Sequence, residues 1–192
     1  MPAMDNEYRL LSDLNMEPSI IKTIKGNLRG QALLPEDSGY EKARTIWNAM
    51  INHRPGLIIR CAGVADVIEA VNFARTQKIL VSVKGGGHNV SGNAVSEGGL
   101  MIDLSPMRSV YVDPSAKIAR AEGGATWKDY DRETQVFGLA STGGAVSRTG
   151  VAGLTLGGGW GWLAGKHGLA CDNLLSIDIV TWDGKVVTAN AN

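Results

Sequence analysis

Two clusters of glycine constrain this chain more than any other feature of its sequence. The first, VKGGGHNVSG, covers residues 83–92, and the second, GGAVSRTGVAGLTLGGGWGWLAGKHGL, covers residues 143–169. Glycine makes up 25 of the 192 residues, nearly twice its usual share of about 7%. Because glycine lets backbone N–H groups approach a ligand closely, Gly85-Gly86-Gly87 at a strand end predicts an anion-binding loop. An anionic cofactor is the expected ligand.

The commoner phosphate-binding motifs do not account for these glycines. The chain has no GxxxxGK[ST] motif, and Cys61-Ala62-Gly63 stands at the first strand-to-helix turn, where a dinucleotide fold would carry GxGxxG. One alternative is that the glycines serve only turns and bulges of a twisted sheet. Another is a site for a different phosphate ligand, such as a nucleotide. Two clusters, one with a histidine between glycine and asparagine, favour the cofactor site.

The pattern of residues 56–84 predicts a βαβ unit. GLIIR (56–60) and ILVSVK (79–84) are short apolar runs typical of strands. The apolar residues between them recur at helical spacing, which predicts a helix with one buried face: Val64, Val67, Ile68, Val71 and Ala74. Strands joined in this way are expected to be parallel, with a right-handed crossover.

The following segments predict more strands and one further helix. LMIDL (100–104), SVYVD (109–113) and KIARAE (117–122) are separated by prolines and indicate strands of a second sheet. A helix is expected over 125–138, ended by Gly138. Asp183-Gly184, between two β-rich runs, predicts a hairpin. Because strands and helices do not strictly alternate, the expected fold class is α+β.

The first 50 residues predict a polar, helical cover for the fold. Leucines at positions 10, 11 and 14 and a later set recur at intervals of three to four residues; the later set is Ala43, Ile46, Trp47 and Met50. This N-terminus has no apolar run before a small-residue cleavage site, so we expect no secretory leader and a reducing, cytoplasmic setting.

Charge and cysteine content exclude several classes of partner. The 19 basic and 19 acidic residues balance, without a block of either sign, so neither nucleic acid nor an anionic membrane is an expected partner. No stretch reaches the roughly 20 apolar residues that span a bilayer. Cys61 and Cys171 have no CxxC or HExxH motif beside them, so we expect no metal site and interpret both as buried core residues.

At GGGHN and at TGVAGLTLGGGWGWLAGKHGLACDNLLSIDIVTWDG the sequence resembles a known family. It is similar to the FAD-binding PCMH-type domain of the vanillyl-alcohol-oxidase class, in its berberine-bridge-enzyme-like and 6-hydroxynicotine-oxidase-like branch. The resemblance runs from about Gly30 to the last residues, which leaves 1–30 as a helical extension. It implies two small α+β lobes with FAD between them, a βαβ-containing lobe over about 31–104 and a mostly antiparallel lobe over about 105–192.

The resemblance also implies how FAD is held. The loop VKGGGHN would wrap the pyrophosphate and flavin, with His88 bonded to the flavin 8α carbon, whereas His53 and His167 match no such role. Some relatives add a second bond from a cysteine, but Val146 stands at that place, so a single attachment through His88 is expected. Lys84 stands where many relatives have arginine, which keeps the charge but loses the bidentate fork.

The full set of cofactor-binding residues implied by the resemblance lies in the two glycine clusters. The set is Lys84, Gly85, Gly86, Gly87, His88, Asn89, Ser91, Gly92, Gly143, Gly144, Thr149, Gly150, Val151, Gly153, Leu154, Gly157, Gly158 and Gly159. Trp160 and Trp162 are interpreted as packing anchors of the core rather than as flavin-stacking residues. Asp172 and Asn173 are expected to cap or turn the backbone.

The function implied is that of an FAD-dependent oxidase whose flavin accepts hydride from an alcohol or amine and is reoxidised by oxygen. Members of this branch are more than twice as long, with a substrate domain after the flavin domain that carries the catalytic base. No catalytic residue is therefore assigned here. Three alternatives remain open: a fragment of an oxidase, one half of a split enzyme, or a free-standing module that binds FAD without turnover.

Overall fold

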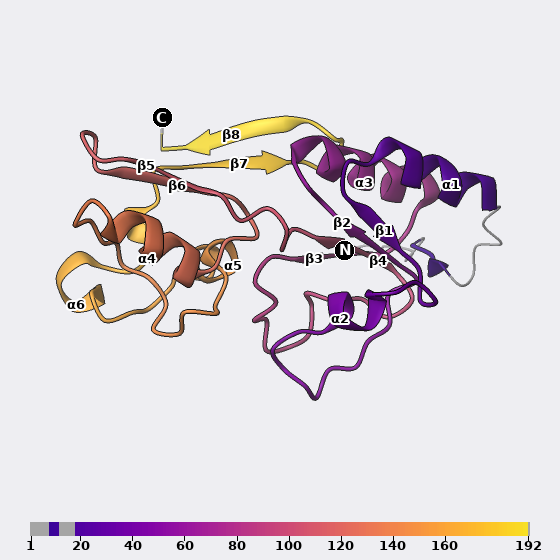
Figure 1. Cartoon of the computed structure of the whole chain (residues 1–192), viewed down its shortest axis with the longest axis horizontal. Helices are drawn as coiled ribbons and strands as arrows, with labels where there is room; N and C mark the ends of the chain where they lie inside the picture. The colour runs from indigo at the N-terminus through magenta and orange to yellow at the C-terminus, as the bar shows by residue number, and fades with distance from the viewer. Residues whose placement is uncertain (1–7, 12–17, 192) are drawn as a thin grey trace, which may run out of the picture.

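The computed structural model describes residues 8–11 and 18–191, and its elements lie in two neighbouring groups (Figure 1). One group holds a four-stranded sheet with helices on both of its sides. The other holds two antiparallel strand pairs and three short helices. The predicted α+β class is confirmed. No helix in the described ranges is long and apolar enough to cross a membrane.

The four-stranded sheet contains the predicted βαβ unit. Its strands, in spatial order, are β1 (Gln31–Leu33), β2 (Leu57–Arg60), β4 (Leu100–Asp103) and β3 (Val81–Lys84). Helix α3 (Val64–Gln77) connects β2 to β3, and both strands run parallel to β4, which lies between them. Strand β1 pairs antiparallel with β2. The parallel orientation expected for β2 and β3 is confirmed.

The assignment of LMIDL to a second sheet was wrong. Strand β4 is the central strand of the first sheet, and all four of its residues are buried. A short apolar run without alternation is typical of a parallel strand covered on both faces. Local pattern does not encode strand order, so the central place of β4 could not be predicted from the sequence.

The core of this group lies on both faces of the sheet because side chains alternate along each strand. Leu57 and Ile59 of β2 face α3 and join one apolar cluster with Leu100 and Ile102. On the opposite face, Ile58 and Met101 pack in a second cluster, with partners from helix α2 (Tyr40–Arg44) and the segments around it. These partners are Tyr40, Ala43, Ile46, Ala94 and Val95.

The expected helical cover over the first 50 residues was only partly right, because Gln31–Leu33 forms strand β1 and no helix continues beyond Arg44. Helix α1 spans Pro18–Asn27 and helix α2 only Tyr40–Arg44. Thr45 turns extended, with φ −67° and ψ 135°, and Ile46 then enters the core while the Trp47 N–H donates to Gly87 O at 2.9 Å. Leu10 and Leu11 lie beside a short pairing of Arg9 with Ile79, and position 14 falls outside the described residues.

The second group consists mainly of antiparallel strand pairs, β5 with β6 and β7 with β8. Its elements are β5 (Val110–Asp113), β6 (Ile118–Ala121), α4 (Trp127–Gln135), α5 (Val151–Leu156), α6 (Ala164–His167), a 3-10 turn (Cys171–Asn173), β7 (Ser176–Val180) and β8 (Val186–Asn190). The predicted hairpin is confirmed, since Gly184 adopts φ +79° at its turn. The boundary near residue 104 between two lobes stays a prediction.

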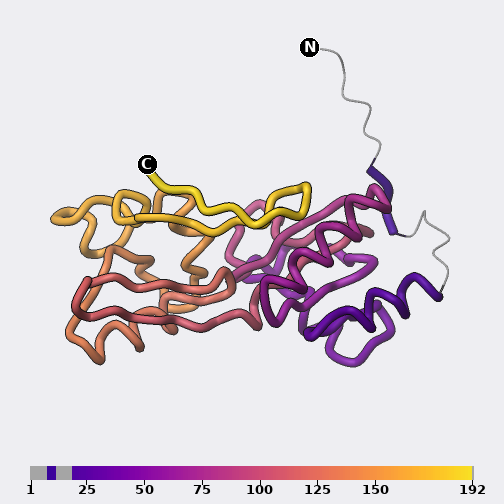
Figure 2. The backbone as a smooth tube through the Cα atoms, turned by 90° about the horizontal axis from the view of Figure 1, so that it is seen from above, coloured from indigo at the N-terminus to yellow at the C-terminus, as the bar shows by residue number. Residues whose placement is uncertain are grey.

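The β7–β8 hairpin reaches from one group to the other (Figure 2). Its turn lies against α3, where a Cβ on Gly184 would come within 2.5 Å of the Asn72 side chain. On the other side, Arg120 of β6 forms an ion pair with Asp178 of β7 at 2.6 Å. Val180 packs against the core cluster below α3. The β7–β8 hairpin therefore contacts elements of both groups.

Three expectations about burial in the second group were wrong. Trp160 and Trp162 are 60% and 80% exposed and contact each other edge to face, with ring centroids 5.6 Å apart. Cys171 is also exposed, whereas Cys61 is buried as expected. In the part of the chain that the structure describes, Trp160, Trp162 and Cys171 belong to no buried apolar cluster. Asp172 and Asn173 do cap local backbone, through bonds to Leu169 N and O.

A buried carboxylate joins the segment between α1 and β1, the β2–α3 turn and α3, and its removal is expected to destabilise the fold. Asp66 is 2% exposed and accepts backbone N–H bonds from Arg29, Gly30 and Ala62 at 2.9, 3.0 and 2.7 Å. Asp66→Ala should lower the free energy of unfolding by roughly 2–4 kcal/mol, because three donors lose a charged acceptor. Urea titration measures the change.

Glu69→Ala on the same helix is the matched control, since Glu69 makes only a 3.5 Å contact with Asn27. It should change stability by less than about 0.5 kcal/mol. Equal effects of the two substitutions would contradict the role given to Asp66.

Candidate functional site

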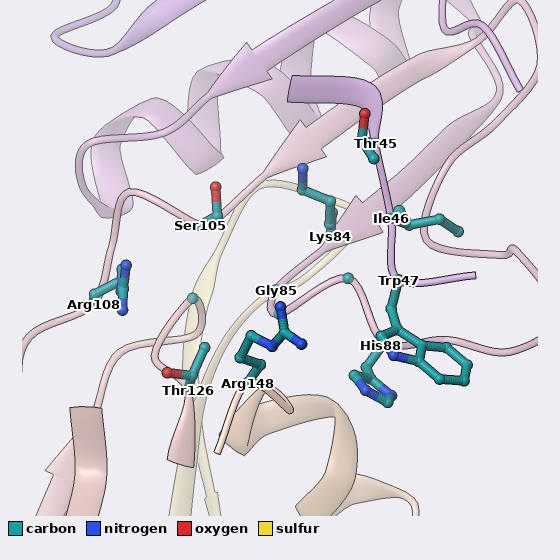
Figure 3. Close-up of a pocket in the computed structure, with 13 residues that line it drawn as sticks. Thr45, Ile46, Trp47, Lys84, Gly85, His88, Ser105, Arg108, Thr126 and Arg148 are labelled. Carbon is teal, nitrogen blue, oxygen red and sulfur yellow. The ribbon is translucent and has the colours of Figure 1, made fainter. Parts of the chain in front are cut away.

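The first glycine loop begins at the carboxyl end of the parallel strands. Arg60, Asp103 and Lys84 end β2, β4 and β3 and lie in register across the sheet. Gly85, Gly86 and Gly87 follow at once and lead the chain over this edge toward the second group (Figure 3). Ligands of sheets with parallel strands are commonly bound at this edge. The sequence therefore places its glycine loop where the fold favours a ligand.

The two glycine clusters meet at Gly86 and Gly150. A Cβ on Gly86 would lie 2.4 Å from Gly150 N, and a Cβ on Gly150 would lie 2.7 Å from Gly86 N. Real Cβ atoms do not approach backbone so closely, so only glycine fits on either side. Gly150 is held in place by a bridge to Thr126 and by the bond from Trp127 N to Thr149 O at 3.0 Å.

A cavity of about 280 Å³ opens beside this contact (Figure 3). Both groups of elements supply its walls. Its lining residues are Thr45, Ile46, Trp47, Lys84, Gly85, Gly86, Gly87, His88, Ser105, Arg108, Gly124, Thr126 and Arg148. The lining includes a lysine and two arginines but no acidic residue, so it favours an anionic ligand.

The two arginines of the cavity differ in the charge they offer to a ligand. Arg108 binds Asp129 in a fork, with Nη2 2.6 Å from Oδ1 and Nε 3.0 Å from Oδ2. Arg148 is exposed and has no ion pair or hydrogen bond from its side chain to any described residue. Arg148 is therefore the cation with its full charge free for an anion.

Lys84 forms the floor of the cavity and is only 7% exposed. Its Nζ donates to Ala43 O and lies 3.6 Å from Asp103 Oδ1. Asp103 also accepts from Arg60 Nε at 3.2 Å and from Ser105 N at 3.0 Å. Burial lowers the pKa of Lys84, and the Asp103 carboxylate opposes that shift. The Asp103 carboxylate thus partly balances the charge of Lys84.

His88 has the one side chain in the cavity with an unpaired buried ring nitrogen. Its Nε2 is buried and has no hydrogen-bond partner among the described residues. The ring stacks on Trp47, with centroids 4.5 Å apart and planes at 18°. A buried polar atom without a partner is uncommon and points to a missing ligand.

These features fit the FAD that the sequence predicts. Backbone donors of the glycine loop and the Arg148 guanidinium suit a diphosphate. Because glycine stands at 86 and 150, no side chain keeps a flat or extended cofactor away from the loop backbone. The His88 imidazole lines the same cavity. A volume of about 280 Å³ lies just below the usual range of ligand pockets, roughly 300–1,000 Å³. It suits one portion of a dinucleotide.

The structure brings together only part of the predicted set. Residues 84–88 line the cavity and Gly150 touches them. Asn89, Ser91 and Gly92 turn the loop away, with the Asn89 side chain bonded to Ser91 and Asn93. The remaining members lie near the cavity or behind it without lining it: Gly143, Gly144, Thr149, Val151, Gly153, Leu154, Gly157, Gly158 and Gly159. Their roles in cofactor binding stay predictions.

The glycines behind the cavity serve close packing in the structure. Gly143 and Gly144 lie against the Trp127 ring, which a Cβ on Gly143 would approach to 2.4 Å. Gly158 and Gly159 have φ of +103° and +79°, and their carbonyls accept from Cys171 and Ala170. These positions build the turn after α5.

Several cavity residues were missed from the sequence. Arg148 lies inside the second glycine cluster. A cationic side chain among glycines is a signal from which its place in an anion site could have been predicted. Thr126 forms a capping box with Asp129, so its pattern indicated a helix start and not a site. The others carried no local signal, because distant segments bring them to the cavity: Thr45, Ile46, Trp47, Ser105, Arg108 and Gly124.

Comparison with known proteins identifies the family of this chain. Residues 55–190 match the family model described as FAD binding domain. The chain belongs to this family. The match contains all the strands except β1, and it contains both glycine clusters. The family resemblance predicted from the sequence is confirmed.

Individual relatives of this FAD-binding domain are oxidoreductases by name. (R)-6-hydroxynicotine oxidase of Paenarthrobacter nicotinovorans is 38% identical over 161 residues, which are 84% of this chain and 35% of the relative. FAD-linked oxidoreductase pgmH of Aspergillus terreus is 37% identical over 173 residues, with 88% and 35% covered. The chain thus spans about a third of the length of the curated relatives it matches.

Solved structures show the same fold. The crystal structure of 6-hydroxy-D-nicotine oxidase from Arthrobacter nicotinovorans superimposes with a TM-score of 0.83 at 38% identity, covering 85% of this chain and 36% of that one. BBE-like 1 of Physcomitrella patens gives a TM-score of 0.84 at 29% identity, covering 89% and 38%. The arrangement of the FAD-binding domain is therefore shared with both.

Gly86→Ala should separate the two glycine clusters, because its Cβ would meet Gly150 backbone atoms at 2.4 and 2.5 Å. We expect FAD affinity to fall at least about tenfold, since a shift of this size misplaces the loop donors. Flavin retained by the purified chain, measured by absorbance, gives the result. Gly165→Ala, where a Cβ meets nothing within 4 Å, is the control and should bind FAD normally. Normal binding by Gly86→Ala would refute the contact's importance.

The lowered pKa of Asp129 predicts that the stability of the fold decreases at acid pH. Burial of the carboxylate favours its protonated form, but bonds from Arg108 and Thr126 outweigh this and hold the pKa of Asp129 at about 2, against about 3.9 when unfolded. Because the folded pKa is the lower one, the carboxylate stabilises the fold above about pH 4 and this contribution disappears toward pH 2. Asp129→Asn should therefore show a weaker loss of stability over that interval.

Denaturant titrations between pH 5 and pH 2 measure this slope. Asp131→Asn is the control, because burial raises the pKa of Asp131 and its removal cannot weaken the acid sensitivity in the same way. An unchanged slope for Asp129→Asn would rule out the assignment.

Proposed function

We propose that this chain is the FAD-binding part of an FAD-linked oxidase, with the flavin held by a single covalent bond to His88. The observation that carries the proposal is the unpaired, buried Nε2 of His88 beside the meeting point of the two glycine clusters. The family and the names of the relatives support the cofactor and the class of reaction.

The residues of the chain divide the work of holding FAD. Backbone N–H groups of Gly85, Gly86 and Gly87 would bind phosphate oxygens, and Arg148 would add a charged fork. Lys84 would contribute a second charge from the floor of the cavity. Glycine at 86 and 150 keeps side chains out of the space between the clusters. The site is built before the ligand arrives, which reduces the entropy cost of binding.

The His88 imidazole supplies the nucleophile for attachment. A neutral imidazole nitrogen can add to an electrophilic carbon when the loop holds it in line. Attachment through one residue is supported by Val146 at the place where some relatives have a cysteine. Cys171, the exposed cysteine, lies in the 3-10 turn after α6 and does not line the cavity.

When bound, FAD accepts hydride from a substrate and returns the electrons to dioxygen, which becomes hydrogen peroxide. The proposed substrate class is an alcohol or an amine. The relatives' names include oxidases of 6-hydroxynicotine and of chitooligosaccharides, in keeping with both. The groups that select the substrate and accept its proton are proposed to lie in the two thirds of the relatives that this chain does not match.

His88→Ala should abolish covalent attachment while FAD still binds reversibly, because the glycine loop and Arg148 are unchanged. After acid denaturation, the parent chain should keep its flavin fluorescence and show an added mass of one FAD less two hydrogens. The variant should show neither. His167→Ala is the matched control, since His167 is exposed and does not line the cavity. Retention of bound flavin by His88→Ala would overturn the assignment.

Turnover separates the oxidase from a module that only carries FAD. The full-length protein containing this domain should bleach its flavin with an alcohol or amine under anaerobic conditions and form peroxide when oxygen returns. Stable flavin absorbance with every member of a panel of both classes would instead favour a carrier.

A further inference from the structure

The segment after α2 runs along the first glycine loop on both sides of His88. Trp47 N donates to Gly87 O at 2.9 Å, and Asn48 Nδ2 donates to Val90 O at 2.8 Å. Ile51 packs so closely against Gly92 that a Cβ there would lie 2.9 Å from it. Residues 47–51 are therefore bound to the loop backbone before and after the histidine.

The Trp47 indole covers one face of the His88 ring (Figure 3). The two rings are nearly parallel, with planes at 18° and centroids at 4.5 Å. No hydrogen bond from another described residue fixes the imidazole, and its Nε2 is buried without a partner. The stack is thus the interaction that sets the plane of the imidazole.

Trp47 is also part of the cavity wall. It is 58% exposed, although its backbone is tied to Gly87. A large aromatic ring held at the surface in this way does little for the core, which takes its packing at this point from Ile46. Its stacking on the His88 imidazole suggests that it serves to orient that ring.

We infer that Trp47 is a positioning residue that orients the His88 imidazole for attachment to the flavin. The inference rests on the proposed function of His88. Attachment forms a bond between an imidazole nitrogen and the flavin 8α carbon and breaks one methyl C–H bond and one imidazole N–H bond. Dioxygen takes up the two hydrogens with their electrons as hydrogen peroxide. Trp47 takes no part in these bond changes and acts only through the ring it stacks on.

The first test compares rates of flavin attachment. Apo-chain is mixed with FAD in air, and covalent flavin is followed over time after acid quenching. Trp47→Leu keeps apolar bulk but removes the aromatic face, so attachment should slow by about tenfold or more. Trp47→Phe restores a stacking ring and should stay within about threefold of the parent. Reversible FAD affinity is measured by fluorescence before attachment, and the rates are compared at saturating FAD, so that a change in binding is not mistaken for slower attachment.

The second test needs no flavin. In the apo-chain, NMR signals of the His88 ring protons should be shifted upfield by the indole, and the shift should be lost in Trp47→Leu and partly kept in Trp47→Phe. Equal attachment rates in all three chains, or unaltered ring signals in Trp47→Leu, would overturn the positioning role. A parent chain that releases all its flavin on denaturation would overturn the proposed covalent bond, and the inference with it, while the NMR signals still report the stack.

Discussion

The backbone contact between Gly86 and Gly150 is the constraint on which the rest of the site depends. It joins a loop at the carboxyl edge of the parallel sheet to the segment that precedes α5. Because each backbone occupies the space that the other's Cβ would need, the two groups of elements can meet at this point only with glycine on both sides. The cavity, its cations and the His88 imidazole take their places around this contact.

The three cations of the cavity differ in how far a carboxylate neutralises each of them. Lys84 is buried over Asp103, Arg108 is forked onto Asp129, and Arg148 has no carboxylate partner in the described part of the chain. Buried or paired cations hold the walls in position, whereas the free one is left for the ligand. Such a division gives a preorganised site in which little rearrangement is needed when an anion binds.

The sequence predicted features whose cause is local. The βαβ unit follows from apolar periodicity, and the hairpin from Asp183-Gly184, since Gly184 needs positive φ. The motifs predicted the family and the loop at 84–88. The sequence did not predict contacts between distant segments, so the central place of β4 and the stack of Trp47 on His88 were missed. The exposure of Trp160 likewise depends on what packs around it, which composition does not reveal.

The position of β4 has a consequence for the order in which the first group can form. Among the described residues, β3 has no neighbour in the sheet other than β4, which comes last in the chain of the four strands of this sheet. Its ladder forms only with residues 100–103, so the strand from which the glycine loop leaves is paired with a segment that follows the loop in the chain. Non-local parallel pairing of this kind slows folding. The start of the glycine loop is therefore held in the sheet by a strand that comes later in the sequence than the loop itself.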